Sequence, residues 1–188
     1  MKKSTSASIL LLTLISSITL NGVVSEGPKE VESWFETISR DKLPEKMTKL
    51  HFYFHDLSKG KNVTAVVVAQ SNVTSFGVLA SADDPMTVGP ELMSKRVGYL
   101  KGLYMTASFE EVDLLMAMTF VFTDEIYNGS SLSVMGHNPH QHLYREVPVV
   151  GGSGRFRLAR GVATLHNYFH NLTMGKFIVE VDIVVFHY

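Results

Sequence analysis

Residues 176–188, KFIVEVDIVVFHY, place an apolar side chain at every second position over most of their length. Side chains two residues apart lie on the same face of a β-strand, so one face of this stretch is continuously apolar. The pattern predicts a strand that packs this face into a core. The face carries Phe177, Val179, Val181, Ile183 and Val185.

Strand-like segments precede this one along the chain, and turn residues separate them. Short strands at regular spacing, without a long helical pattern, predict an all-β protein folded as an antiparallel sandwich or barrel. The clearest of these segments are KLHFYFHD (49–56), NVTAVVVAQ (62–70), GLYMTASF (102–109), LLMAMTFVFT (114–123) and YNGSSLSVMG (127–136).

Two charged residues continue faces that are otherwise apolar. In residues 155–168 the alternation places Arg160 on the face of Phe156, and in residues 49–56 it places Asp56 on the face of Phe54. Burying either charge alone costs several kcal/mol, so the pattern predicts that they pair or line a wet cavity. The alternative is that Asp56 ends its strand in solvent while a β-bulge turns Arg160 outward.

The chain begins with the pattern of a secretory signal peptide, which we expect to span residues 1–25. Two lysines precede the apolar run SILLLTLISSITL, and small residues follow where cleavage would occur. A membrane anchor is the alternative, but the apolar run is short for one. Residues 26–47 are polar and contain two prolines, so they are expected to form an N-terminal arm before the main domain, 48–188.

The composition of the chain argues against some classes of partner and excludes some kinds of chemistry. A formal net charge of −1 favours neither nucleic acid nor an anionic membrane as a partner. The absence of cysteine excludes disulfides and thiol catalysis, so a secreted domain needs a closed sheet or oligomerisation for stability. In a secreted chain, the four N-x-S/T motifs predict N-glycosylation, at Asn62, Asn72, Asn128 and Asn171.

Five segments, in this order, resemble the plant dirigent family: FYFHD, SFGVLASADDPMTVGP, GLYMTASFEEVDLLMAMTFVFT, YNGSSLSVMG and REVPVVGGSGRFRLARGVA. The resemblance covers nearly all of the chain after the leader. It implies an eight-stranded antiparallel β-barrel, usually a homotrimer, that is N-glycosylated and secreted to the apoplast and cell wall. The barrel is expected to enclose a pocket for plant phenols.

The resemblance also implies a function without a cofactor. The protein would orient phenoxy radicals of the monolignol type, made by a separate laccase or peroxidase, so that they couple regio- and stereoselectively in lignan, lignin or related phenylpropanoid metabolism. The alternative is dehydration of isoflavanols, as in pterocarpan synthases. Many lignan-forming members carry an acid directly after the GGxG run, where this chain has Arg155.

The site residues are carried over from the same resemblance. A carboxylic acid could protonate a quinone-methide oxygen, and a guanidinium could hold that oxygen as charge develops. These catalytic roles are assigned to Asp56 and Arg160, a hydroxyl donor to Tyr104, and an apolar wall for the phenol to Phe54, Phe120 and Phe156.

Two further patterns have competing interpretations. His140 and His142, followed by Glu146, have the spacing of a cupin metal site, but the surrounding segment is polar and reads as an exposed loop, so no metal is expected. Asp83 and Asp84, followed by a proline, could form a second acidic cluster in the pocket, although an exposed turn is favoured.

Overall fold

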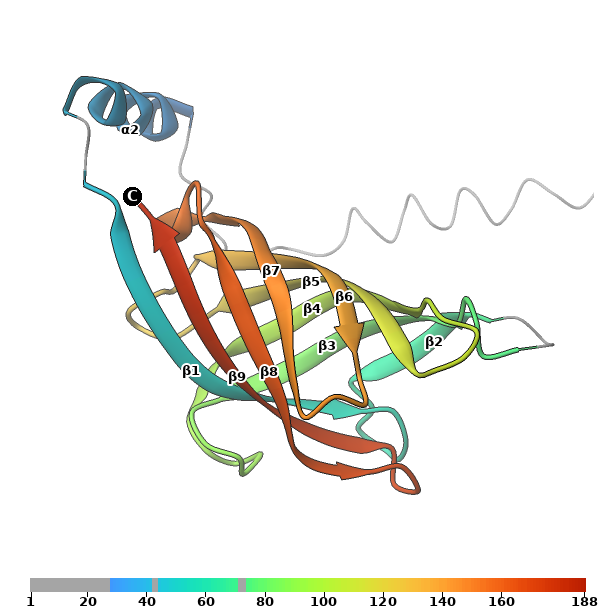
Figure 1. Ribbon diagram of the computed structural model, residues 1–188. Helices are drawn as coiled ribbons and strands as arrows, with labels where there is room; N and C mark the ends of the chain where they lie inside the picture. Colours follow the sequence, from blue (N-terminus) through green and yellow to red (C-terminus); the bar gives the residue numbers. More distant parts are fainter. Residues whose placement is uncertain (1–27, 42–43, 71–73) are drawn as a thin grey trace, which may run out of the picture.

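The computed structural model describes residues 28–41, 44–70 and 74–188 of the chain. One helix precedes a long antiparallel sheet that makes up nearly all of the described residues (Figure 1). The elements are α2 (Pro28–Asp41), β1 (Lys46–Leu57), β2 (Ala65–Ala69), β3 (Leu79–Thr87), β4 (Arg96–Thr106), β5 (Asp113–Phe122), β6 (Ser131–Pro139), β7 (Tyr144–Ser153), the 3-10 turn η1 (Gly154–Phe156), β8 (Arg160–Asn171) and β9 (Lys176–His187).

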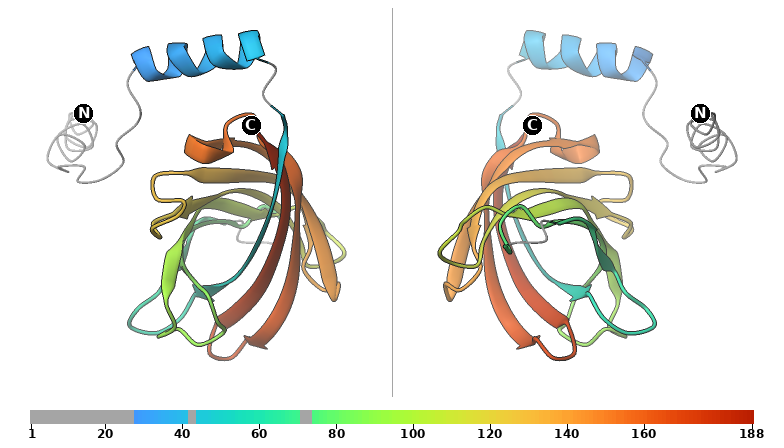
Figure 2. Two further views of the ribbon diagram at one scale, coloured as in Figure 1. Left: turned by 90° about the vertical axis from the view of Figure 1, so that its left-hand side faces the viewer. Right: turned by 90° about the vertical axis from the view of Figure 1, so that its right-hand side faces the viewer.

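Eight of the strands close into a barrel. Neighbouring strands follow the order β1-β9-β8-β7-β6-β5-β4-β3, and β1 returns to pair with β3, where Tyr53 and Phe54 lie opposite Thr87 and Met86. β2 adds to the other end of β3. Figure 2 shows the strands curving around a common interior. The predicted eight-stranded antiparallel barrel is therefore confirmed, with β2 as a short addition.

Aromatic side chains fill one end of the barrel interior. Phe52 meets Phe120 edge to face with ring centroids 5.3 Å apart, and Phe156 lies 5.6 Å from Phe122 and 5.0 Å from Tyr127. Such edge-to-face and tilted pairs stabilise a core beyond the area that they bury. This cluster lies towards the His187 end of β9, so it leaves the other end of the barrel free for a cavity.

The connection from β7 to β8 corrects one expectation from the sequence. Residues 155–168 were expected to form one continuous strand, but Gly154–Phe156 form a 3-10 turn and Leu158 has a left-handed backbone with φ 55°. The alternation of faces therefore starts again at β8, and Ala163 and Leu165 are its buried residues.

Arg160 consequently lies on the outside of the barrel. Its side chain is 63% exposed, forms an ion pair with Glu45, and stacks over Phe186 with the guanidinium carbon 5.7 Å from the ring centroid. The prediction that Arg160 shares the inner face of Phe156 is wrong. Phe156 lies in the turn η1 and Arg160 begins strand β8, so the alternation of inward and outward side chains does not run on from one to the other.

The N-terminal segment forms a longer helix than the sequence suggested. Where a loose arm was expected over 26–47, α2 runs from Pro28 to Asp41, and Arg157 stacks over the indole of Trp34 at 4.9 Å. The proposed signal peptide, residues 1–25, lies outside the described residues. Among the residues that are described, no helix has the length and hydrophobicity to cross a bilayer.

Candidate functional site

A cavity of about 530 Å³ lies inside the barrel at the end opposite the aromatic cluster. This volume is within the range of small-molecule binding sites. Its walls are mostly apolar, formed by Phe54, Leu100, Val112, Leu114, Met116, Met118, Leu165, Leu172, Phe177 and Val179. Its polar lining consists of Asp56, Asp84, Tyr104, Asn138, His140, Gln141, Arg145, Asn167 and His170.

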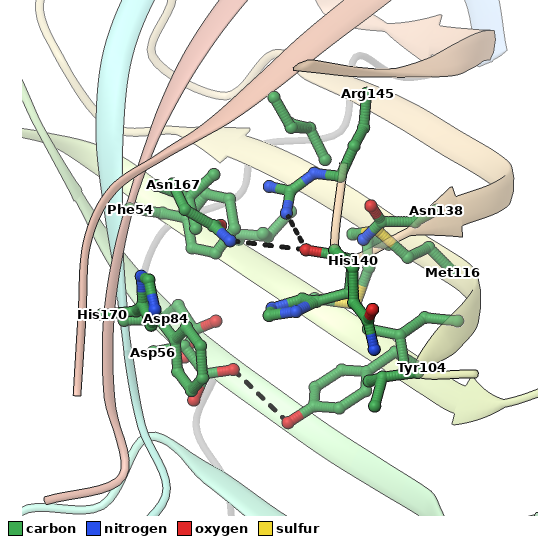
Figure 3. A pocket seen from close by; sticks show the side chains of 18 of the residues that line it. Phe54, Asp56, Asp84, Tyr104, Met116, Asn138, His140, Arg145, Asn167 and His170 are labelled. Atoms are coloured by element: carbon green, nitrogen blue, oxygen red, sulfur yellow. Dashed lines mark hydrogen bonds between the residues drawn. The ribbon is translucent and has the colours of Figure 1, made fainter. Parts of the chain in front are cut away.

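An acidic cluster occupies one side of the cavity (Figure 3). The pairing of Phe54 with Met86, extended by two residues, places Asp56 of β1 opposite Asp84 of β3. The hydroxyl of Tyr104, on β4, donates to Asp56 Oδ2 at 3.3 Å. Asp56 Oδ1 is buried and has no hydrogen-bond partner within the described part of the chain, so this oxygen is available to a ligand.

The two carboxyl groups hold protons more tightly than ordinary aspartates do. Burial raises the pKa of Asp56, and the hydrogen bond from Tyr104 opposes this only in part. Burial raises the pKa of Asp84 further, and the nearby charge of Asp56 adds to the effect. Asp84 is only 1% exposed. Because two close carboxylates in a dry site resist ionising together, the pair retains a proton near neutral pH.

The hydrogen bonds around Thr64 agree with a protonated Asp84. Thr64 Oγ1 accepts from the backbone N–H of Leu57 at 2.9 Å and lies 3.2 Å from the carbonyl oxygen of His55 and 2.6 Å from Asp84 Oδ1. One hydroxyl proton cannot serve both of those oxygens. If Asp84 is protonated, it donates to Thr64, whose own proton then goes to the carbonyl, and each of these hydrogen bonds has a donor and an acceptor.

A buried guanidinium lies on another wall of the cavity. Arg145 is 2% exposed and shares the inward face of β7 with Val147 and Val149. Its Nη1 donates to the carbonyl oxygen of His140 at 3.1 Å, while its Nε has no partner among the described residues. Burial lowers its pKa to about 10, so it remains charged at neutral pH. In the part of the chain that the structure describes, no carboxylate forms an ion pair with it.

The histidine-rich segment contributes one residue to the cavity. His140 is half-buried, and burial lowers its pKa to about 4, with the charges of Arg145 and His170 adding to the effect, so it is neutral near pH 7. His142 and Glu146 are exposed. The three residues with the spacing of a metal site thus do not converge, and no other group of three or more potential ligands is found among the described residues.

The structure brings together only part of the predicted site. Phe54, Asp56 and Tyr104 line the cavity as expected. Phe120 and Phe156 do not line it, because both are fully buried in the aromatic cluster at the other end of the barrel. Arg160 is on the exterior, so the expected pairing of Arg160 with Asp56 is wrong.

Arg145 was missed and Asp84 was placed in the pocket only by the less favoured interpretation, although the sequence carries a signal for each. Arg145 alternates with Val147 and Val149, which is the same pattern that drew attention to Arg160. Asp84 alternates with Ala82 and Met86, both of which are buried in β3. The less favoured interpretation of this acidic pair, as part of the pocket, is the one that the geometry supports for Asp84.

The proposed glycosylation sites differ in their exposure. Asn62 and Asn128 lie in exposed turns, where a glycan can be accommodated. Asn171 is half-buried at the end of β8, and its Oδ1 accepts from the backbone N–H of Met174 at 3.0 Å. Asn72 falls outside the described residues.

A closed barrel with an apolar cavity, a carboxyl pair and a buried guanidinium has the features of a binding site for a small, largely apolar ligand with polar groups. Residues 47–186 match the family described as Dirigent-like protein. The chain belongs to the dirigent family, as its sequence motifs indicated.

Characterised relatives place the chain within this family. Pterocarpan synthase 1 from Glycyrrhiza echinata is 47% identical over 150 residues, which cover 77% of this chain and 80% of the relative. Dirigent protein 21 from Arabidopsis thaliana is 37% identical over 184 residues, covering 95% and 97% of the two chains. A solved pterocarpan synthase dirigent protein superposes with a TM-score of 0.74 at 46% identity, covering 78% of this chain and 87% of that one.

Proposed function

We propose that this barrel binds phenylpropanoid phenols and orients phenoxy radicals, generated by a separate laccase or peroxidase, for regio- and stereoselective coupling. Membership of the dirigent family and the size and apolar walls of the cavity support this proposal. Holding two reactive molecules in one geometry decides which faces meet, which is an effect of orientation and needs no oxidising group in the protein.

The carboxyl pair supplies the chemistry that follows coupling. Each radical contributes one electron to the new carbon–carbon bond, and the product is a quinone methide. A hydroxyl group then adds to the quinone-methide carbon, so the hydroxyl loses a proton while the quinone-methide oxygen gains one. Asp84 can donate that proton, and Asp56 can accept the other, because the pair shares a proton near neutral pH. The observation that carries the proposal is the placement of two carboxyl groups, Asp56 and the buried Asp84, against one apolar cavity of about 530 Å³.

Dehydration of an isoflavanol is a second candidate, and the same observation favours it. A protonated carboxyl can donate to a departing hydroxyl, which leaves as water, while the ionised carboxylate takes a proton from the ring phenol to give a quinone methide. An internal hydroxyl then adds to the quinone-methide carbon and closes the new ring, losing its proton while the quinone-methide oxygen regains one. The identity of 47% with the pterocarpan synthase from Glycyrrhiza echinata supports this alternative.

One pair of assays tests both candidates. Coniferyl alcohol is treated with a one-electron oxidant, with and without the protein, and the enantiomeric ratio of the coupled products is measured. An excess of one enantiomer that depends on the protein supports radical steering, whereas a racemic mixture contradicts it. An isoflavanol incubated without oxidant tests the second candidate, because dehydration changes no oxidation state.

We also propose that the protein is a secreted, N-glycosylated homotrimer of the cell wall. Exposed apolar side chains on the outer faces of the strands, among them Val150, Val162 and Val184, support an oligomer that covers them. The mass of the mature protein from plant tissue, before and after removal of N-glycans, tests leader cleavage and glycosylation. Light scattering on the same material measures the number of chains.

A further inference from the structure

A polar group separate from the carboxyl pair surrounds the carbonyl oxygen of His140. Arg145 Nη1 donates to this oxygen at 3.1 Å, and Asn167 Nδ2 donates to it at 3.5 Å. In Figure 3 both side chains point towards this carbonyl from different strands, and Asn138 lines the same cavity. Extending the pairing of Val134 with Val149 by four residues places Asn138 opposite Arg145.

Each of these three side chains has a buried polar atom without a protein partner. The unpaired atoms are Asn138 Oδ1, Asn167 Oδ1 and Arg145 Nε, when partners are sought among the described residues. Asn138 is 4% exposed, and its Nδ2 donates a hydrogen bond to the sulfur of Met116 at 2.9 Å. If the oxygen and nitrogen of the Asn138 amide are exchanged, the atom that faces away from Met116 is still unpaired, so the result does not depend on the orientation of the amide. Buried polar groups are normally hydrogen-bonded, so this group calls for a partner that the protein does not supply.

The unpaired atoms define the chemistry of that partner. Two of them are amide oxygens, which accept hydrogen bonds, and the third is an N–H group, which donates. A hydroxyl group can donate to an amide oxygen and accept from the guanidinium at the same time. An ether oxygen can only accept, and a hydrocarbon can do neither.

We propose that Asn138, Asn167 and Arg145 form a subsite for a free hydroxyl of the ligand, distinct from the oxygen that faces the carboxyl pair. The inference rests on the proposed binding of phenols and adds a selection rule to it: the cavity takes phenols that carry a second hydroxyl at their far end. A site built to hydrogen-bond a hydroxyl rejects the analogue without it, because its own polar groups are then left unpaired.

Two phenols that differ in one hydroxyl test the subsite without any reaction. Dihydroconiferyl alcohol carries a terminal hydroxyl on its side chain, and 4-propylguaiacol lacks only that group. We expect the full-length protein to bind the first at least about 10-fold more tightly in calorimetric titrations. Equal affinities would overturn the subsite while leaving phenol binding intact. If neither phenol binds, the subsite and the proposed function both fail.

The variant Asn138→Leu tests whether Asn138 causes the preference for the phenol with the terminal hydroxyl. Leucine keeps the branched arrangement of side-chain heavy atoms without the polar groups, so we expect the affinity for 4-propylguaiacol to stay equal or increase, while the preference for the hydroxyl falls below about 3-fold. His142→Leu is the control and should leave the preference unchanged, since His142 is exposed in the same connection between β6 and β7 and does not line the cavity. A full preference retained in Asn138→Leu would overturn the proposal. The comparison of the two phenols on the unmodified protein decides the case even if the variant does not fold.

Discussion

Asp84 is the residue whose protonation the proposed chemistry depends on most directly. In Asp84→Asn the amide can still accept from Thr64 Oγ1 through its oxygen or donate to it through its N–H, so the local hydrogen bond survives while the transferable proton is lost. We expect the rate of protein-directed product formation to fall by about 100-fold or more, the usual contribution of a general acid. The free energy of unfolding should not fall, because no buried charge is left unpaired.

The neighbouring residue provides the control for this change. Asp83 is exposed and pairs with Lys101 at 3.2 Å, on the outer face of the same strand. Asp83→Asn should leave both the product rate and the urea unfolding curve nearly unchanged. Full activity in Asp84→Asn, or equal losses in both variants, would remove Asp84 from the acid role.

Substituting methionine for Arg145 and for Arg160 compares the loss of an arginine inside the barrel with the loss of one outside it. Arg145→Met removes the cavity's guanidinium, so we expect product selectivity to be lost while thermal stability is kept or raised, because an unpaired buried charge disappears. Arg160→Met breaks an exposed ion pair and should change neither selectivity nor the melting temperature appreciably. Enantiomeric ratios and melting curves measure both effects. Loss of selectivity only in Arg160→Met would contradict the assignment.

The contrast between these arginines shows what alternation can predict at the level of residues. Alternation identifies the inner face only within one strand, and it places Asp56 correctly because Phe54 and Asp56 belong to β1. It misplaced Arg160 because the turn at Gly154–Phe156 lies between Phe156 and β8. Arg145 satisfied the rule, but the polar residues before it led to the interpretation of an exposed loop.

At the scale of elements, the apolar strands were recognisable and the polar ones were not. β1, β5 and β9 follow from composition and alternation. β3 was taken for a turn because its centre contains two aspartates and a proline, residues that usually interrupt strands. Along this edge of β3, β2 pairs with the first residues and β1 pairs with the last two. Pro85 falls between these two pairings, so its lack of a backbone N–H is tolerated.

The connection between β7 and β8 gives a prediction of its own. Leu158 combines a left-handed backbone, φ 55°, with a side chain that is 61% exposed. A non-glycine residue in this conformation costs about 1 kcal/mol, so Leu158→Gly should be more stable than Leu158→Ala by about that amount. Urea unfolding of the two variants measures the difference. In an ordinary strand position the order is reversed, so a more stable alanine variant would contradict this backbone conformation.

At the scale of the whole molecule, two kinds of buried group decide how stability depends on pH. Burial lowers the pKa of His55 and of His140 from 6.5 to about 4, so the unfolded chain binds more protons at these sites. Their contribution to stability is present above pH 6.5 and is lost as the pH falls towards 4. Asp56 and Asp84 have raised pKa values, so the folded barrel binds the extra protons there, and their contribution is lost as the pH rises.

Between pH 4 and 6.5 these two effects oppose each other, and we expect the free energy of unfolding to change little. Above pH 6.5 the histidine contribution is complete, and the carboxyl pair alone sets the slope. The free energy of unfolding should then fall with rising pH, by at most about 1.4 kcal/mol per pH unit for each proton. Urea unfolding at constant ionic strength measures this slope. Asp84→Asn should abolish most of the fall, and stability that rises above pH 6.5 in the unmodified protein would contradict a protonated carboxyl pair in the cavity.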